Sequence, residues 1–160
     1  MRSMVYKTIS VVLVIAVVMV FMAAHHEKES DDLASLKEAF NLNRESWKAA
    51  DIETHFSTVH PQGSGINGGG RLSNMQDVDY EQVRGWAEWV SENMESQIDN
   101  LNFNVIQDGI AIVTYTQILT GKENGREVRI THSHVWTRTE GKWLRLHSQE
   151  TFLTADLVDM

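Results

Sequence analysis

The apolar residues of this chain are unevenly distributed, and the first run of them stands apart from the rest. Residues 11–24 are apolar without interruption, follow the basic residues Arg2 and Lys7, and give way at once to polar sequence. This order is typical of a secretory signal peptide, and the run is shorter than the roughly 20 residues of a membrane-spanning helix. We predict a signal peptide over residues 1–24, with an uncleaved N-terminal anchor as the alternative, and therefore a periplasmic or secreted protein.

The first half of the remaining chain shows the 3.6-residue period of helices. Ser30 and the acids after it predict a helix start, and apolar residues at one-turn spacing extend this helix to Trp47. Asp51 is expected to cap a short second helix that ends at Pro61, and Asp77 is expected to open a third. The inner side of the third helix is expected to hold Tyr80, Val83, Trp86 or Ala87, and Val90. All five tryptophans of the chain are expected to lie mostly in the core.

The second half of the chain alternates apolar and polar residues, which is the pattern of β-strands. Four strands are predicted, over residues 98–106, 111–120, 128–138 and 143–152. Asn124-Gly125 predicts a two-residue hairpin turn, and residues 138–142 fit a three-residue loop that ends in a left-handed glycine. The glycine-rich segment over 62–74 is expected to be a loop with at most a short strand. Helices followed by an antiparallel meander predict an α+β domain, with the helices on one face of a curved sheet.

These turn lengths set the register of the last three strands, and the register decides which side chains share a face. In this register Tyr115 lies opposite His134, and His134 lies opposite Leu146. The more apolar face is expected to hold Val113, Tyr115, Gln117, Leu119, Ile130, His132, His134, Trp136, Leu144, Leu146, Ser148 and Glu150. The more polar face is expected to hold Thr114, Thr116, Arg129, Thr131, Ser133, Thr137, Trp143, Arg145, His147 and Gln149. A one-residue slip in either turn would exchange the two faces.

The chain that follows residue 24 is strongly acidic. Residues 1–24 contain two of the 14 basic residues and none of the 22 acidic ones, which leaves 12 basic and 22 acidic residues and a formal charge of −10. The lack of a basic excess argues against nucleic acid as a partner. The absence of cysteine excludes disulfides, a thiol nucleophile and a Cys-based zinc site. Any chemistry must therefore come from other side chains, such as His, Tyr and Glu.

An apolar sheet face with a few convergent polar groups is the pattern of a small-molecule pocket. His132 and His134 are the candidate catalytic bases, Glu150 is placed to orient His132, and Tyr115 can donate its hydroxyl. Further candidates for lining the pocket are Trp47, His60, Gln117, Trp136 and Ser148. The His132-x-His134 spacing can hold a metal with Glu150 as third ligand, but we expect a pair without metal and a protein without cofactor. If the second turn had two residues instead, His147 would lie opposite His134 and a three-histidine site would become possible.

Several short motifs of this chain occur together in one protein family. They are Ser133-His134-Val135-Trp136, Gly141-Lys142-Trp143 and Leu146-His147-Ser148-Gln149, preceded by a helix with Trp47, by Ala50-Asp51, by Val59-His60-Pro61 and by Gly68-Gly69-Gly70. Over residues 32–153 the chain resembles the nuclear transport factor 2-like superfamily, most closely its SnoaL-like proteins and the calcium/calmodulin-dependent kinase association domain. The resemblance implies a cone with a cystatin-like roll, a curved antiparallel sheet wrapped around N-terminal helices, with one deep pocket and commonly a dimer. We therefore predict a flexible segment over 25–31 and a nuclear transport factor 2-like domain over 32–155.

Two pocket positions depart from the kinase-type branch of that family, in which both are Arg. They are His134 and Glu150 here, so the resemblance does not carry a carboxylate-binding Arg pair over to this chain. The Asp and Tyr of the ketosteroid isomerase branch have no clear match either, since Asp51 lies at a helix-cap position. The superfamily hosts many activities on one fold, so the function has to be argued from the site.

Three functions remain open at this point. The first is an exported protein that binds a small, mostly apolar molecule without chemistry. The second is an enzyme of the isomerase, dehydratase or hydrolase type, with His132 or His134 as base. The third is an assembly module that forms a homodimer through the exposed sheet face around Thr131, Arg145 and His147. No nucleic acid is expected as a partner, and no membrane apart from the possible N-terminal anchor.

Overall fold

The structure, a computed structural model, describes residues 31–107 and 109–153. The predicted signal peptide over 1–24 and nearly all of the predicted segment over 25–31 lie outside the described residues. Contacts divide the chain into two units, residues 1–35 and residues 36–160, which are described separately. In the first unit, residues 31–35 are helical, and the Ser35 hydroxyl donates to the carbonyl oxygen of Asp32 at 3.0 Å. Within the described ranges we find no helix with the length and apolar character needed to span a membrane.

The second unit begins with helices, and the predicted ones are present. The first helix ends at residue 48. Helix α2 covers Ile52–Ser57, and the Asp51 carboxylate caps it by accepting from the Thr54 N–H. Helix α3 covers Tyr80–Asn93. Its cap is Asp79 rather than the predicted Asp77, because Asp77 closes a single-turn 3₁₀ helix over Met75–Asp77.

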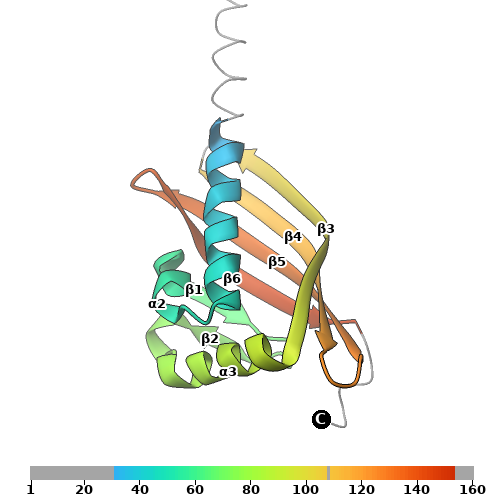
Figure 1. The fold of residues 1–160 in the computed structure, drawn as a ribbon. Helices are drawn as coiled ribbons and strands as arrows, with labels where there is room; N and C mark the ends of the chain where they lie inside the picture. The colour runs from blue at the N-terminus through green and yellow to red at the C-terminus, as the bar shows by residue number, and fades with distance from the viewer. Residues whose placement is uncertain (1–30, 108, 154–160) are drawn as a thin grey trace, which may run out of the picture. The chain divides into compact units, whose positions relative to one another are not determined.

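A curved six-stranded sheet makes up the rest of this unit, and it is not closed into a barrel (Figure 1). The strands are β1 (Val59–Ile66), β2 (Leu72–Asn74), β3 (Met94–Gln107), β4 (Ile110–Gly121), β5 (Glu127–Thr139) and β6 (Lys142–Phe152). Their order across the sheet is β2-β1-β6-β5-β4-β3, so the last four form the predicted antiparallel meander and β1 adds to β6 in parallel. The α+β class predicted from the sequence is confirmed.

Strand β1 replaces the end of the predicted second helix. Val59 and Pro61 were expected in or just after that helix, but both lie in β1. Proline has no N–H for a strand ladder. Pro61 fits because the pairing of β1 with β6 is interrupted between Val59 and Ser64. The predicted loop over 62–74 therefore contains most of β1 and all of β2.

The first hairpin has a longer loop than the Asn124-Gly125 turn predicts. The Gly121 N–H donates to Arg126 at 2.9 Å and the Gly125 N–H donates to Gly121 at 2.8 Å, which closes a loop over residues 122–125. Tyr115 consequently lies opposite His132, and the predicted pairing with His134 is wrong. The error is two residues, and since side chains alternate with period two, the predicted faces of β4 and β5 remain correct.

The second hairpin has a two-residue turn in place of the predicted three-residue loop. Glu140 and Gly141 have φ of 52° and 81°, the two positive values of a type I′ turn. Trp136 pairs with Arg145, but the preceding residue, Val135, pairs with His147. Strand β6 therefore has one extra residue, a β-bulge, directly after Arg145. Because of the two-residue turn, Trp143 and Arg145 lie on the concave face of the sheet, and their predicted place on the polar face is wrong.

The core lies between the first helix and the concave face of the sheet (Figure 1). It contains Leu36, Phe40, Ala111, Val113, Trp136 and Trp143, all nearly inaccessible to solvent. A smaller cluster of Val90, Leu119 and Ile130 joins α3 to the other end of the sheet. Trp86 and Trp89 were expected in the core, but they are 55% and 45% exposed. Both side chains line a cavity instead of the core.

Candidate functional site

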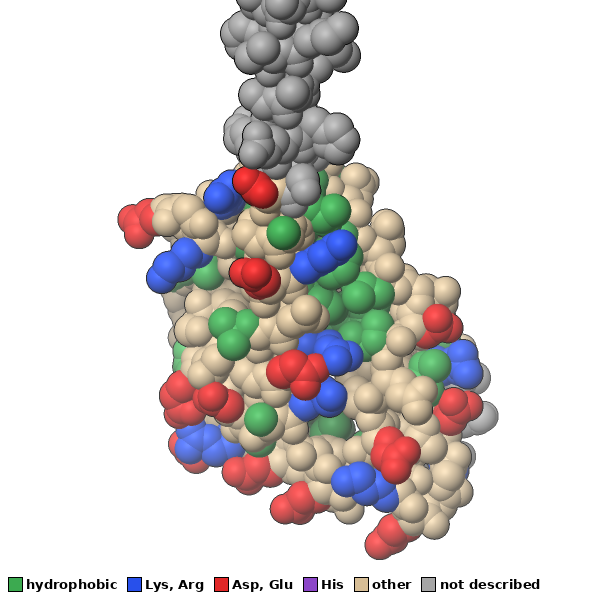
Figure 2. Space-filling view, turned by 45° about the horizontal axis from the view of Figure 1, so that its top comes forward, with side chains coloured by type: hydrophobic (Ala, Val, Ile, Leu, Met, Phe, Trp, Pro, Cys, Tyr) green, Lys and Arg blue, Asp and Glu red, His purple; other side chains and the backbone are tan. Residues whose placement is uncertain are grey.

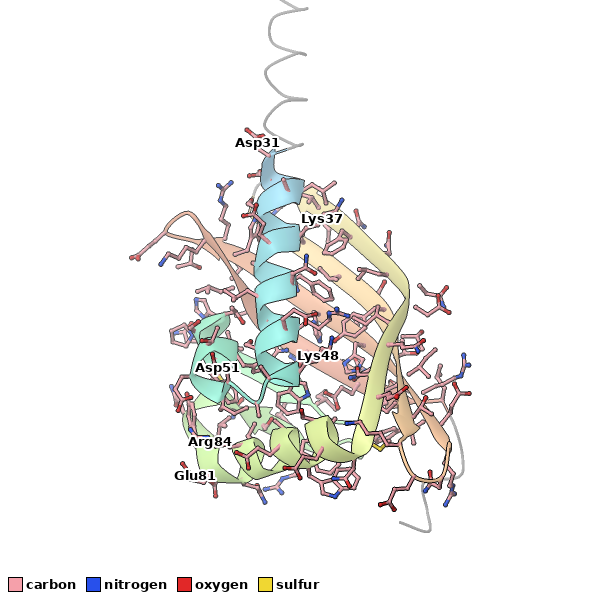
Figure 3. The ribbon with its side chains drawn as sticks, in the orientation of Figure 1. Asp31, Lys37, Lys48, Asp51, Glu81 and Arg84 are labelled. Carbon is pink, nitrogen blue, oxygen red and sulfur yellow. The ribbon has the colours of Figure 1, made fainter. Side chains whose placement is uncertain are left out.

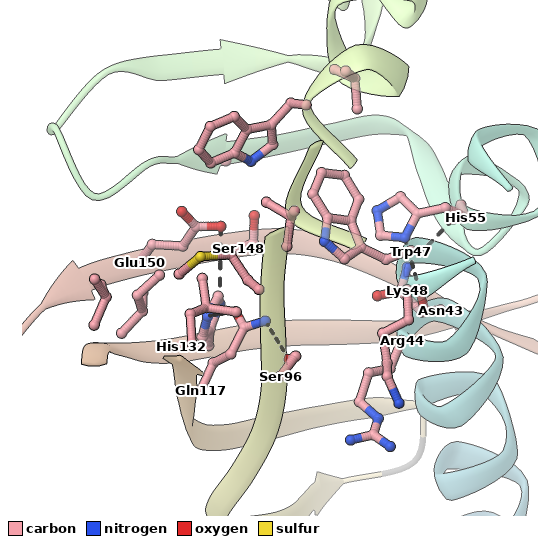
Figure 4. A pocket seen from close by; sticks show the side chains of 18 of the residues that line it. Asn43, Arg44, Trp47, Lys48, His55, Ser96, Gln117, His132, Ser148 and Glu150 are labelled. Atoms are coloured by element: carbon pink, nitrogen blue, oxygen red, sulfur yellow. Dashed lines mark hydrogen bonds and ion pairs between the residues drawn. The ribbon is translucent and has the colours of Figure 1, made fainter. Parts of the chain in front are cut away.

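The concave face of the sheet, the end of the first helix, α2 and α3 enclose a cavity of about 730 Å³ (Figure 4). Its walls are mostly apolar. Seven of the predicted site residues line it: Trp47, Tyr115, Gln117, His132, His134, Ser148 and Glu150. The other two do not line it. Trp136 is completely buried in the core, and His60 lies on β1, where its Nδ1 accepts from the Gln62 N–H at 3.1 Å.

His132 is held in one orientation by a stacked ring and a hydrogen bond. Its ring lies parallel to that of Tyr115, with centroids 4.5 Å apart. Its Nε2 is 3.1 Å from the Gln117 side-chain oxygen, and the Gln117 amide in turn donates to the Ser96 hydroxyl at 3.0 Å. Since Nε2 faces an acceptor, it carries the proton, and Nδ1 keeps its lone pair.

The free nitrogen of His132 faces the carboxyl group of Glu150. Its Nδ1 lies 3.9 Å from Glu150 Oε1, too far for a hydrogen bond, and has no partner among the described residues. Burial, followed by the nearby charge of Arg145, lowers the pKa of His132 to about 4. Burial also raises the pKa of the Glu150 carboxyl, against the opposing effects of Arg145 and the Gly68 N–H. The pair therefore combines a neutral imidazole with a carboxyl group that holds its proton more tightly than usual.

His134 lies deeper than His132 and is also neutral. Its side chain is 2% exposed, meets the Tyr115 ring edge-on at 5.3 Å, and its Nδ1 has no partner among the described residues. Burial lowers the pKa of His134 well below its usual value, and the charge of Arg145 adds to this. A base with so low a pKa accepts a proton weakly near neutral pH. Both neutral histidines are better suited to form a hydrogen bond with a ligand than to act as strong bases.

Arg145 is the site residue that the sequence did not reveal. It projects from β6 into the cavity, where Nη1 donates to Asn43 Oδ1 and Nη2 donates to His55 Nε2, each at 3.2 Å. The Asn43 amide is itself fixed, because it donates to the Thr58 hydroxyl at 2.6 Å. The Arg145 backbone N–H donates to the Thr58 carbonyl oxygen at 2.8 Å, which ties β6 to the end of α2.

The tautomer of His55 follows from its two contacts. Its Nδ1 is 2.9 Å from the backbone oxygen of Asn43 and must donate, so Nε2 is free to accept from Arg145. Burial, and then the charge of Arg145, lowers the pKa of His55 to about 4, consistent with a neutral ring. Arg145 is thus held by two neutral groups. Among the described residues, no carboxylate lies within 4.0 Å of its guanidinium.

The open side of the cavity is aromatic. Trp86 and Trp89 lie on α3, line the cavity, and stack on each other with ring centroids 5.3 Å apart. Met75 and Val78 add apolar surface from the segment before α3. The cavity therefore runs from a polar inner end to an apolar rim.

The possible metal site does not form within the described ranges, where no group of three or more His, Asp or Glu side chains gathers around a common point. The two-residue turn that could have brought a third histidine into the site is present, but the bulge after Arg145 sends His147 to the other face. There its Nδ1 lies 2.8 Å from the Ser64 hydroxyl. Arg145 likewise belongs to the cavity rather than to the predicted assembly face.

Comparison with known proteins supports the fold. No protein-family model matches the chain, and no curated protein matches its sequence. A cystatin-like-fold protein from Caulobacter vibrioides is 15% identical, with a TM-score of 0.65 over 78% of this chain and 91% of that chain. A nuclear transport factor 2-like protein with a cystatin-like fold from Novosphingobium aromaticivorans is 10% identical, with a TM-score of 0.67 over 84% and 90%.

A ketosteroid isomerase-like protein from Erwinia carotovora atroseptica is 14% identical, with a TM-score of 0.59 over 77% of this chain and 97% of that chain. The structural neighbours are therefore nuclear transport factor 2-like proteins, as the sequence resemblance predicts. At these identities the likeness concerns the fold, and the chemistry rests on the cavity itself.

Proposed function

We propose that this protein binds a small, mostly apolar molecule in its conical cavity. The observation that carries the proposal is the cavity of about 730 Å³, whose apolar walls surround a few fixed polar groups. Ligand sites commonly enclose roughly 300 to 1,000 Å³ and combine these two features. The Nδ1 atoms of His132 and His134 are buried polar atoms without a hydrogen-bond partner among the described residues, and that of His132 is an acceptor. A buried polar atom left unpaired is costly, so a ligand donor at this point would be stabilising.

The proposal can be tested with pyrenebutanol, a neutral fluorescent molecule of suitable size. We expect saturable binding of one molecule per chain. A Ser96→Trp variant should weaken it, because the half-buried Ser96 lines the cavity and an indole there would take up part of the space. Gln97→Trp is the matched control, since Gln97 is the exposed next residue of β3 and does not line the cavity. No saturable binding to the wild type, or equal binding to both variants, would contradict the proposal.

A second candidate is an enzyme that moves a proton within this cavity. It is favoured by one observation, the Glu150 carboxyl 3.9 Å from the free nitrogen of His132. One structural neighbour is described as a ketosteroid isomerase-like protein and another as a "putative ketosteroid isomerase", so a ketosteroid is the first substrate to assay. A rate with a limb near neutral pH that disappears in Glu150→Gln would support catalysis. A ligand that binds without turnover would instead support the binding function alone.

Two further properties predicted from the sequence, export and a homodimer, are proposed as well. We propose export directed by residues 1–24, which cell fractionation would test. We also propose a homodimer formed through the outer sheet face, with Thr131 and His147 but without Arg145. A monomer by light scattering at micromolar concentration would contradict the dimer.

A further inference from the structure

We propose that the ligand is an amphiphilic carboxylate, whose carboxylate group binds Arg145 while its apolar part extends to Trp86 and Trp89. This inference rests on the proposed binding function and names the class of molecule that the cavity takes. It follows from four features of the cavity: the state of the Arg145 guanidinium, the distribution of charge, the number of unpaired cations and the apolar rim.

The guanidinium of Arg145 is fixed in place but not neutralised. Arginine stays protonated in proteins, and its partners Asn43 and His55 are both neutral acceptors. They occupy two of its five N–H donors, which leaves three donors without a described partner. A guanidinium fork matches the two oxygens of a carboxylate, and the rigid attachment to Asn43 and His55 reduces the entropy lost on binding. An oxyanion is therefore the complement that this group lacks.

Charge is distributed unevenly around the cavity, although the protein as a whole is acidic. Arg44 and Lys48 line the same end as Arg145, and Figure 3 shows Lys48 on the last turn of the first helix, near α3. Figure 4 shows Asn43, Arg44 and His55 on one side of the cavity and Glu150 on the other. The other acids that line the cavity, Glu123 and Glu127, belong to the β4–β5 hairpin. The inner end near Arg145 is thus the favourable place for a negative charge.

The cations near Arg145 differ from it in their partners. Arg44 and Lys48 share the carboxylate of Glu45, so each of them has an acidic partner, although one positive charge of this group remains uncompensated. Figure 2 shows this mixed character on one face, where Lys and Arg side chains lie beside acidic and apolar ones. Among the described residues at this end of the cavity, Arg145 is the one cation without an acidic partner. A ligand carboxylate would supply the acidic partner that its guanidinium lacks.

The rim explains why the rest of the ligand is apolar. Trp86 and Trp89 expose large ring surfaces to solvent, a costly arrangement for two neighbouring aromatic side chains on a helix. These rings line the same cavity as Arg145, so a ligand whose head lies at Arg145 can place its apolar part against them. The exposed pair then becomes a contact surface for the ligand.

The experiment compares two probes that differ only in charge, pyrenebutanoic acid and pyrenebutanol, with the full-length chain at neutral pH and low salt. We expect the wild type to bind the acid about tenfold more tightly or better, since charge-assisted hydrogen bonds contribute that much. Arg145→Met should bind both probes equally and should bind the alcohol at least as well as the wild type does. Arg145→Lys keeps the charge but loses the fork, so its preference should be intermediate.

Arg129→Met is the matched control, because Arg129 is exposed, does not line the cavity and gives the same change in net charge. It should keep the wild-type preference. Wild-type protein that binds the alcohol as tightly as the acid would overturn the inference and leave the proposed binding function standing, and this result needs no variant. A preference that survives in Arg145→Met would also overturn it. Wild-type protein that binds neither probe would contradict the binding function as well.

Discussion

The buried histidines make acid stability the most informative property to measure. Burial lowers the folded-state pKa of His55 and of His132 from 6.5 to about 4. Between these two values, the unfolded chain binds protons that the folded protein does not bind, so stability falls as the pH falls from about 6.5 toward 4. His134 acts in the same direction, since burial lowers its pKa as well.

The size of the effect follows from the same values. With an unfolded pKa of 6.5 and a folded pKa of about 4, the linkage costs about 2 kcal/mol per histidine at about pH 5, or ~4 kcal/mol for His55 and His132 together. Glu150 works in the opposite direction, because its pKa is raised in the folded state and its protonation there offsets part of the loss. A net loss of even about 3 kcal/mol is a large share of the stability of one domain.

The assay is urea unfolding at neutral pH and at about pH 5, together with NMR titration of the imidazole signals. We expect a clear drop in the free energy of unfolding at the lower pH. His55→Asn is the test variant, since an Asn amide can replace Nδ1 as donor to the Asn43 carbonyl, and its drop should be smaller by about 2 kcal/mol. A free energy of unfolding that is independent of pH over this interval, or imidazole signals of His55 and His132 that titrate near 6.5, would refute the reasoning.

Substitutions at four further positions test the fold, each by chemical denaturation. Phe40→Ala should cost about 3 to 5 kcal/mol, because Phe40 is 1% exposed and packs against three aromatic rings; a loss below ~1 kcal/mol would contradict its place in the core. Asp51→Ala should cost about 1 kcal/mol by removing the cap of α2, whereas Asp51→Asn should cost much less. Gly141→Ala should cost about 1 kcal/mol because its φ is 81°, although space is free around it. Gly85→Ala, inside α3 with equally free space, should instead stabilise by ~0.5 to 1 kcal/mol, and a loss there would contradict the helix.

The strands of the meander could be predicted from the sequence because their signal is local. Residues 111–120 were predicted as a strand and β4 covers Ile110–Gly121, since a half-buried strand shows its alternation in the sequence itself. Strand β1 had no such signal. It contains a proline and two glycines, and it is extended because it pairs with β6, about 80 residues away in the chain.

The register and the site were harder to predict, for a different physical reason. Asn124-Gly125 suits a two-residue turn, but it equally suits a longer loop whose glycine has a positive φ, here 65°. The choice between them depends on packing across the strands, which no short window contains. Similarly, the helical pattern placed Trp86 and Trp89 on α3 correctly, but the pattern cannot tell a side chain that faces the core from one that faces a cavity rim.

The bulge of β6 is the feature that assembles the candidate site. In a regular strand, Arg145 shares its face with His147 and Gln149, and Ser148 and Glu150 point the other way. The register shift after Arg145 reverses the alternation, so that Arg145 and Glu150 both face the cavity. The pairing of β1 with β6 breaks at the same place, between Val59 opposite Arg145 and Ser64 opposite His147. Bulges commonly redirect side chains next to functional sites. Here a single extra residue keeps Glu150 on the same face as Arg145. The arginine itself was missed because the sequence predicted a three-residue turn before β6, which places Arg145 on the opposite face.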